Sequence, residues 1–248
     1  MNPASFQSAP SATPDAIRER SPFSAATDFD DLAARFSLVA TEVLVAGRRW
    51  IVRRPRSCDD LINEEDFDRD DRLPYWAELW PSARAMAERV GRLPGAGGRL
   101  LELGCGVGLA SMAAAAAGFD TLATDYYAEA LEFTERNAAA NGVALATRLI
   151  DWRRLPDELG RFDWVVASDV LYERPNAELV AAAIGRTLAP RGTALVSDPG
   201  RRPADRFPAA CEAQGLDLLP VETVPIVHDA KTIDVRMHVI RFKGQPHD

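Results

Sequence analysis

The sequence predicts an α/β domain with a doubly wound, mostly parallel, seven-stranded sheet, preceded by an N-terminal β-hairpin. Three observations indicate this fold. Strand-type apolar runs alternate with helical segments from residue 82 onward, a glycine-rich turn separates the first such strand from an alanine-rich helix, and two long β-type runs end the chain. Alternating strands and helices are typical of βαβ units, whose sheet carries helices on both faces. The two final runs indicate an antiparallel pair that closes one edge.

The chain divides into parts of different composition. Serine, proline and alanine dominate the beginning and the segment 58–72 is strongly acidic, so we expect a mobile tail and a solvated loop. Between them, two β-type runs in residues 36–54 flank Ala46-Gly47, which predicts the hairpin. The predicted parts are a tail over 1–27, an extension over 28–73 and the main domain over 74–248.

The main domain is a regular succession of elements. Apolar runs predict strands, and helical periodicity ending at Gly118 or at Asn141-Gly142 predicts helices. The predicted strands are 99–103, 119–125, 144–151, 161–169, 192–198, 216–227 and 232–243. The predicted helices are 82–90, 109–117, 128–142, 176–188 and 209–215. Open α/β sheets bind their ligands where the carboxyl ends of the parallel strands meet.

Composition excludes several classes of function. A net charge of -8 argues against a nucleic-acid partner, which requires a surplus of lysine and arginine. Cys58, Cys105 and Cys211 show no CxxC spacing, so we expect neither disulfides nor a metal site, but a cytoplasmic protein. No histidine stands near Cys105 in sequence, so we expect this thiol to be packed rather than nucleophilic. No apolar run is long enough for export or for a membrane span, and we take a monomer as the default.

A glycine-rich turn is the strongest local signal. In "LLELGCGVGLAS", Gly104, Gly106 and Gly108 stand between the strand and the helix, so a ligand can approach the backbone closely. The spacing matches neither the dinucleotide fingerprint nor a phosphate loop, which needs Lys followed by Ser or Thr. Glu102, at the end of the strand, favours a positively charged ligand. S-adenosylmethionine carries a sulfonium and an ammonium but no phosphate, so we expect it as the cofactor.

Acidic residues at two later strand ends extend the predicted cofactor site. Asp125 stands about 20 residues beyond the turn, where a carboxylate can accept ribose hydroxyls; the alternative is a helix N-cap. Asp151 can accept the adenine amino group, and Trp152 can stack on the adenine unless it only fills the core. We assign three further residues to this site by their positions at strand ends or in the turn: Tyr126, Ser168 and Cys105.

Three further motifs carry a family resemblance. "WAELWPSA" precedes the glycine turn, "DW" ends the third strand and "SDVLY" ends the fourth. From about residue 82 to its end, the chain resembles the class I, seven-strand S-adenosylmethionine-dependent methyltransferases with their Rossmann-like fold. It is similar in particular to the protein-lysine methyltransferases of family 16, which include enzymes acting on the β-subunit of electron transfer flavoprotein and on chaperones. That group's Asp/Glu-x-x-Tyr/Phe signature is matched by Asp169 and Tyr172, whereas the Asn-Pro-Pro-Tyr signature of nucleobase and glutamine methyltransferases is absent.

The resemblance implies a role for each matching residue. The implied cofactor contacts are Trp80, Trp152, Asp125 and the turn 104–108. Asp169 and Tyr172 would face the methyl group as the catalytic pair. A carboxylate is a weak base, so we expect Asp169 to orient the nucleophile by accepting an amine N–H. The alternatives are a capping or loop-ordering carboxylate for Asp169 and simple ring packing for Tyr172.

The segment "PYWAELWPS" is predicted to border the site. Tyr75, Trp76 and Glu78 are candidates for the rim where the acceptor amine enters. If the segment were helical, Trp76 and Trp80 would face the same way, with Pro81 near the start of the following helix.

These features predict a methyltransferase that uses S-adenosylmethionine, produces S-adenosylhomocysteine and N-methylates a protein lysine without a metal. One alternative is the N- or O-methylation of a small molecule, with residues 1–35 as a lid. The other is a partner subunit that binds the cofactor but does not catalyse.

Overall fold

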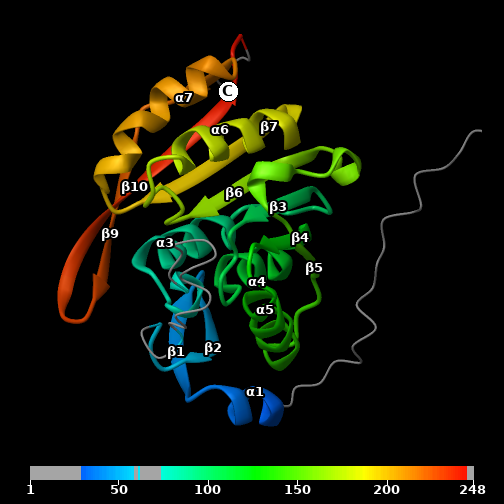
Figure 1. Cartoon of the computed structure of the whole chain (residues 1–248), viewed down its shortest axis with the longest axis vertical. Coiled ribbons are helices and arrows are strands. Elements are labelled where there is room, and N and C mark those ends of the chain that lie inside the picture. The colour runs from blue at the N-terminus through cyan, green and yellow to red at the C-terminus, as the bar shows by residue number, and fades with distance from the viewer. Residues whose placement is uncertain (1–28, 59–60, 62–73, 245–248) are drawn as a thin grey trace, which may run out of the picture.

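A central sheet of eight strands organises the computed structural model, which describes residues 29–58, 61 and 74–244 (Figure 1). Its strands are β3 (Arg99–Leu103), β4 (Asp120–Asp125), β5 (Ala146–Leu149), β6 (Phe162–Ser168), β7 (Leu188–Asp198), β8 (Leu216–Leu218), β9 (Glu222–His228) and β10 (Lys231–Phe242). The helices around it are α3 (Pro81–Val90), α4 (Leu109–Ala116), α5 (Ala128–Ala140), α6 (Asn176–Thr187) and α7 (Phe207–Ala213).

The strand order is β5-β4-β3-β6-β7-β10-β8, with β9 also paired to β10. The first five strands in this order are parallel, and β10 is antiparallel to β7, β8 and β9. The predicted fold class is therefore confirmed, including the antiparallel edge. The predicted strand 216–227 forms two strands instead of one, because Pro220 has no N–H with which to continue the ladder beyond Leu219.

Side chains of alternate residues pack against different helices. In β3, Leu100 belongs to the core under α3, α4 and α5, whereas Leu101 and Leu103 belong to the core under α6 and α7. All three are fully buried. Figure 1 shows the corresponding layers, with α6 and α7 on one side of the sheet and α3, α4 and α5 on the other. The same alternation turns Glu102 toward α4.

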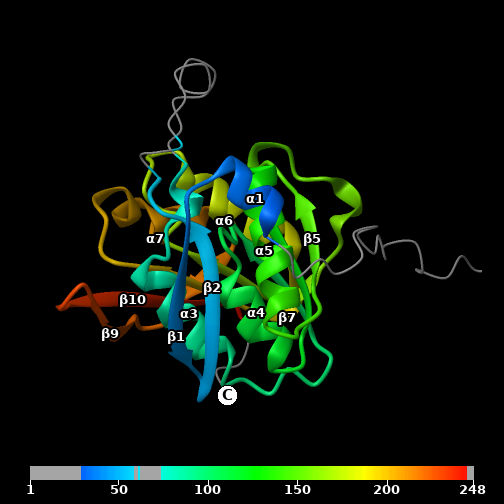
Figure 2. The same ribbon diagram turned by 90° about the horizontal axis from the view of Figure 1, so that it is seen from below.

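The predicted N-terminal hairpin forms β1 (Leu38–Val45) and β2 (Arg48–Pro55). Ala46 and Gly47 make its two-residue turn with positive φ angles of 50° and 74°. Figure 2 shows β1 and β2 side by side across the helical face of α3, α4 and α5. Trp50, 1% exposed, packs into the core on that face. The hairpin therefore covers one helical layer of the domain.

Some predicted segments lie outside the described residues. The expected tail 1–27 and most of the acidic run 58–72 belong to them. Within the predicted extension, a short helix that we did not expect, α1 (Asp30–Arg35), precedes the hairpin. No helix in the described part of the chain is long and apolar enough to cross a membrane.

Candidate active site

A cavity of about 460 Å³ opens at the carboxyl ends of β3, β4 and β6. Most of the predicted site residues line it: Tyr75, Trp76, Glu78, Trp80, Glu102, Gly104, Cys105, Gly106, Asp125, Tyr126, Asp151, Trp152, Ser168, Asp169 and Tyr172. Gly108 does not. It is the N-cap of α4, and a Cβ there would lie 2.7 Å from the Thr134 side chain, so this glycine permits helix packing.

The glycine turn presents its backbone to the cavity. Gly104 and Gly106 have positive φ angles of 74° and 53°. A Cβ on Gly104 would lie 3.1 Å from the Trp152 ring, and one on Gly106 would lie 3.0 Å from the Trp76 carbonyl oxygen. The Gly106 amide donates a 2.9 Å hydrogen bond to Asp125 Oδ2. The turn is therefore held in a shape that only glycine adopts without strain.

Glu102 is a buried carboxylate at the floor of the cavity. Its side chain faces α4, where Ser111 Oγ donates a short hydrogen bond to Oε2. Burial raises the pKa of Glu102 to about 8, and the charge of Asp125 acts in the same direction. A cation in the cavity would lower this pKa again.

Cys105 is packed rather than activated. It is 8% exposed, and its Sγ lies 3.5 Å from Thr134 Oγ1. Burial, together with the charges of Asp125 and Glu102, raises the pKa of the thiol well above its ordinary value. A thiol that resists ionisation is a poor nucleophile, which supports the interpretation of Cys105 as a packing residue.

Asp125 and Asp151 line the cavity and also accept hydrogen bonds from nearby backbone amides. Asp125 accepts hydrogen bonds from the amides of Gly106 and Tyr127, at 2.9 and 3.0 Å, but it is not the N-cap of α5, which is Tyr127. Burial raises the pKa of Asp125. Asp151 accepts from the amide and from Nε of Arg153, at 2.9 Å each. Both carboxylates therefore have fixed orientations.

Three buried polar atoms on the cavity wall have no hydrogen-bond partner among the described residues: Trp152 Nε1, Ser168 Oγ and Asp169 Oδ2. A buried donor or acceptor without a partner costs about 1–3 kcal/mol. Ligands that complete these bonds would recover that cost.

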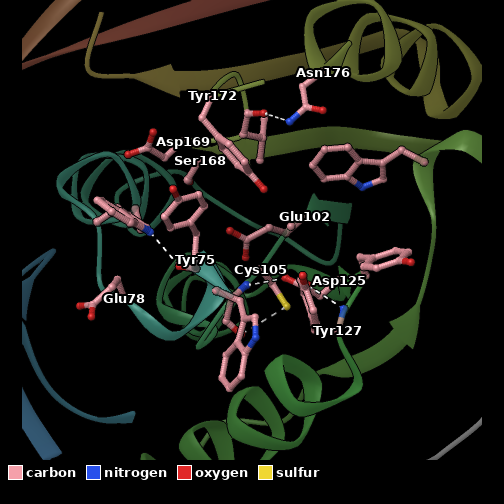
Figure 3. A pocket seen from close by; sticks show the side chains of 18 of the residues that line it. Tyr75, Glu78, Glu102, Cys105, Asp125, Tyr127, Ser168, Asp169, Tyr172 and Asn176 are labelled. Atoms are coloured by element: carbon pink, nitrogen blue, oxygen red, sulfur yellow. Dashed lines mark hydrogen bonds between the residues drawn. The ribbon is translucent and has the colours of Figure 1, made fainter. Parts of the chain in front are cut away.

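Aromatic rings form one end of the cavity. The Tyr75 ring meets those of Tyr172 and Trp80 edge to face, with centroids 5.3 and 6.0 Å apart. Figure 3 shows Tyr75, Tyr172, Ser168 and Asp169 at this end, with Glu102 and Asp125 farther along the cavity. Trp80, expected at the cofactor, therefore lies beside Tyr75.

The segment 74–82 is not one continuous helix. A short 3₁₀ helix, η2 (Tyr75–Ala77), is followed by α3, which begins at Pro81. Trp76 consequently turns into the core, where its ring lies 5.6 Å from that of Phe133, while Trp80 Nε1 donates to the Tyr75 carbonyl oxygen at 2.9 Å. Glu78 pairs with Arg54 of β2 at 2.9 Å.

Asp169 follows β6 with a positive φ of 57° and is 5% exposed. Its amide donates to the Ser197 carbonyl oxygen at 2.8 Å, and its Oδ1 accepts a 2.6 Å hydrogen bond from Arg201 Nε. The Arg201 guanidinium lies 5.4 Å from the centre of the Trp80 ring. Burial opposes the charged form of Arg201, but the hydrogen bond and charge of Asp169 give a net rise in its pKa.

Several residues of the cavity wall were not predicted from the sequence. Arg201 follows β7, and the "SDPGR" turn after an apolar strand could have indicated it. Arg153 and Tyr127 each stand two residues after a predicted acid. Asn176 holds the loop after β6 by donating from Nδ2 to the Val170 carbonyl oxygen at 2.8 Å. No group of three or more metal-ligating side chains occurs in the described part of the chain.

Comparisons with known proteins show the family of the chain. A family model described as "Methyltransferase domain" matches residues 67–238. The electron transfer flavoprotein β subunit lysine methyltransferase of Xenopus laevis is 31% identical over 150 residues, covering 58% of this chain and 59% of that protein. The ubiquinone biosynthesis O-methyltransferase of Methylococcus capsulatus is 34% identical over 107 residues, covering 43% and 45%. The chain thus spans about half the length of these curated relatives.

Solved structures share the fold. A TehB-like S-adenosylmethionine-dependent methyltransferase from Corynebacterium glutamicum superposes with a TM-score of 0.52 at 18% identity, covering 72% of this chain and 94% of that one.

Proposed function

Because the chain belongs to the methyltransferase-domain family of S-adenosylmethionine-dependent enzymes, we propose that it N-methylates a lysine side chain of a protein. The observation that carries the choice of acceptor is Asp169 Oδ2, a buried acceptor without a partner among the described residues, at the aromatic end of the cavity. A neutral amine keeps N–H groups that it can donate to this oxygen. A phenolate acceptor has none and would be repelled by the carboxylate.

The other end of the cavity fits S-adenosylmethionine. Glu102 and Asp125 supply carboxylates for a ligand with an ammonium and a sulfonium, and Asp125 and Asp151 for hydroxyl and amino groups. The turn 104–106 allows close approach, and Trp152 offers an aromatic face with an unpartnered Nε1. The cofactor residues that we propose are Glu102, Gly104, Cys105, Gly106, Asp125, Tyr126, Asp151 and Trp152 at this end, with Trp80 and Ser168 toward the aromatic end, where the methyl group would lie. Gly108 supports the turn from outside the cavity.

The chain's own task is to deliver a neutral amine in line with the methyl group. When bound, S-adenosylmethionine supplies an electrophilic methyl: the amine lone pair bonds to the methyl carbon as the carbon–sulfur bond breaks and its electron pair stays on sulfur. A free lysine has a pKa of about 10.4, so neutralising it at pH 7 costs about 4–5 kcal/mol. The rings of Tyr75, Trp80 and Tyr172 would shield a bound amine from part of the surrounding water, which disfavours the ammonium form.

The first acceptor to test is the electron transfer flavoprotein β subunit, for which the Xenopus laevis relative is named. The purified chain would be incubated with methyl-labelled cofactor and recombinant β subunit, and labelled lysines located by mass spectrometry. We expect label on one or a few lysines, and none on a β subunit in which those lysines are replaced by arginine. Label on non-lysine residues only would contradict the proposal.

Small-molecule methylation is the alternative, supported by relatives named as ubiquinone biosynthesis O-methyltransferases at 30–34% identity. Incubating labelled cofactor with fractionated lysate separates the two. Label confined to the small-molecule fraction would favour this alternative and overturn lysine methylation. We further propose that the protein is cytoplasmic and monomeric, to be checked by fractionation and light scattering.

A further inference from the structure

Arg201 is fixed at the aromatic end by the turn that follows β7. Asp198, which is fully buried, accepts hydrogen bonds from the amides of Gly200 at 2.8 Å and of Arg201 at 3.2 Å. Gly200 has a positive φ of 87°, which lets the chain reverse directly after the strand. The turn thereby directs the Arg201 side chain into the cavity wall.

Asp169 is equally constrained. Its side chain is 2% exposed, and Oδ1 is bound to Arg201 Nε. The strand-end backbone is anchored through the Ser197 carbonyl oxygen. Because one oxygen is fixed, the position of Oδ2 is fixed as well. The pair thus presents one acceptor atom, Oδ2, that no described residue uses.

The charges of the pair have opposite effects on a nearby amine. An isolated carboxylate would hold a lysine in its ammonium form, which has no lone pair for methyl transfer. The guanidinium offsets that attraction. At a separation of about 6–8 Å and an effective dielectric constant of about 20, the charge of the guanidinium changes the protonation equilibrium of an amine by about 1.5–2 pH units, and the nearer carboxylate changes it by more in the opposite direction. The two charges of the pair would therefore act in opposite directions on the protonation of an amine bound beside them.

Resting on the proposed lysine methylation, we propose that Arg201 is a positioning residue: it offsets part of the effect of the Asp169 charge and orients the carboxylate so that Oδ2 accepts an N–H from a neutral acceptor amine. Before transfer, the ammonium loses one proton to water. The resulting amine donates one N–H to Oδ2 and directs its lone pair at the methyl carbon. After the carbon–sulfur bond breaks, the positive charge stands on the methylated nitrogen and sulfur is neutral.

Other charged or titratable groups lie near Arg201 and Asp169, and none of them is replaced in the variants proposed as tests. Asp198 and the Tyr75 hydroxyl face Arg201 along with Asp169. Arg236 of β10 lies against the turn: its Nη2 would be 3.3 Å from a Cβ added to Gly200. Glu173 lines the same cavity as the pair. The variants below therefore alter only the two charges under test.

The test compares single-turnover rates of β-subunit methylation between pH 6.5 and 10, at saturating substrate and cofactor. Arg201→Gln should move the midpoint of the pH profile up by about 1–2 units, with a rate about 10–100-fold lower at pH 7.5 that recovers by pH 10. Asp169→Asn should move the midpoint down; asparagine also tolerates the positive φ. The double variant should have a midpoint between those of the two single variants.

The double variant also covers the risk that Arg201→Gln fails to fold with a buried unpaired carboxylate. Arg206→Gln is the matched control, since it breaks an exposed pair with Glu178 outside the cavity and should leave the profile unchanged. Equal losses at every pH, without opposite shifts of the midpoint, would identify a purely structural role and overturn the inference.

A second measurement needs no turnover. Calorimetry of β-subunit binding to the complex with S-adenosylhomocysteine, in buffers of different ionisation enthalpy, counts released protons. At pH 8 the wild type should release about one proton and Arg201→Gln close to none, while a substrate lacking the acceptor lysine should release none. Equal release by the wild type and Arg201→Gln overturns the inference. Absence of any lysine methylation by the wild type overturns the proposed function itself.

Discussion

The carboxylate of Asp125 binds the amide of Gly106 at 2.9 Å, so the end of β4 holds the turn that follows β3. The same carboxylate also binds the Tyr127 amide at 3.0 Å. A single side chain thus fixes the shape of the glycine turn and orients its own oxygens toward the cavity. Cofactor affinity should therefore depend on Asp125 in two ways, through the turn and through any direct contact.

Asp125→Asn should weaken S-adenosylmethionine binding about 10–100-fold, because hydrogen bonds to a charged group are worth about 1.5–3 kcal/mol and the amide keeps only one acceptor oxygen. Isothermal calorimetry measures the change. Asp120→Asn, at the exposed start of the same strand, is the control and should bind normally. An unchanged dissociation constant in a folded Asp125→Asn protein would remove Asp125 from the cofactor site.

Cofactor affinity should rise with pH up to about 8. Burial raises the pKa of Glu102 to about 8, so below that pH the free protein carries a proton there. A cationic ligand favours the ionised carboxylate, and binding must release the proton. Each pH unit below 8 should therefore weaken binding by at most about tenfold, with a plateau above. Calorimetry in phosphate and in Tris at pH 7 measures the released proton.

Glu102→Gln isolates this effect from the titration of the ligand's own amino group. The variant keeps a partner for Ser111 but cannot ionise, so its affinity should vary less with pH than that of the wild type. Identical pH dependence in both proteins would show that Glu102 does not face the bound cation.

The βαβ core could be predicted from the sequence because strands and helices differ in hydrophobic periodicity and because glycine or asparagine residues mark where the helices end. Gly118 and Gly142 end helices with positive φ, as predicted. Site residues at the carboxyl ends of strands, such as Asp125 at the end of β4 and Asp169 just after β6, could also be predicted, since the carboxyl ends of parallel strands must meet.

Other features depend on tertiary structure. The side chains of Trp76 and Trp80 point in different directions because η2 ends at Ala77 and α3 begins only at Pro81. No local sequence pattern predicts this break in the helix. Arg201 comes near Asp169 only because β7 lies beside β6 in the sheet. The split between β8 and β9 depends on how far Pro220 interrupts the pairing with β10.

A comparison of Gly108 with Gly97 distinguishes two ways in which replacing a glycine destabilises the fold: backbone strain at positive φ, and overpacking by the added Cβ. Both have positive φ, 87° and 78°, but a Cβ on Gly108 would lie 2.7 Å from Thr134, whereas one on Gly97 meets nothing within 4 Å. Gly97→Ala should lower the free energy of unfolding by about 1–2 kcal/mol through backbone strain alone. Gly108→Ala should lose about 1–3 kcal/mol more through overpacking. Urea denaturation measures both, and equal losses would contradict the packing role assigned to Gly108.

Asn137 and Asn141, one turn apart in the region of α5, each clamp one residue of β2. Asn137 accepts from the Arg53 amide at 2.9 Å and donates to its carbonyl oxygen at 2.8 Å, and it also donates to the Val107 carbonyl oxygen at 3.1 Å. Asn141 makes the same pair of bonds to Ile51, at 3.0 and 2.8 Å, in an exposed setting. The two clamps thus differ in burial and in the bond to the glycine turn.

Asn137→Ala should therefore lower the free energy of unfolding by about 2–4 kcal/mol, because it leaves part-buried backbone groups of β2 and a buried carbonyl oxygen of the turn without this partner. Asn141→Ala, the matched control, should lose about 1 kcal/mol or less, since water can replace its bonds. Urea denaturation of the two variants and the wild type gives both differences. Equal losses would mean that burial of the clamp does not set its strength, and that the hairpin is held to α5 mainly by apolar contacts such as those of Trp50.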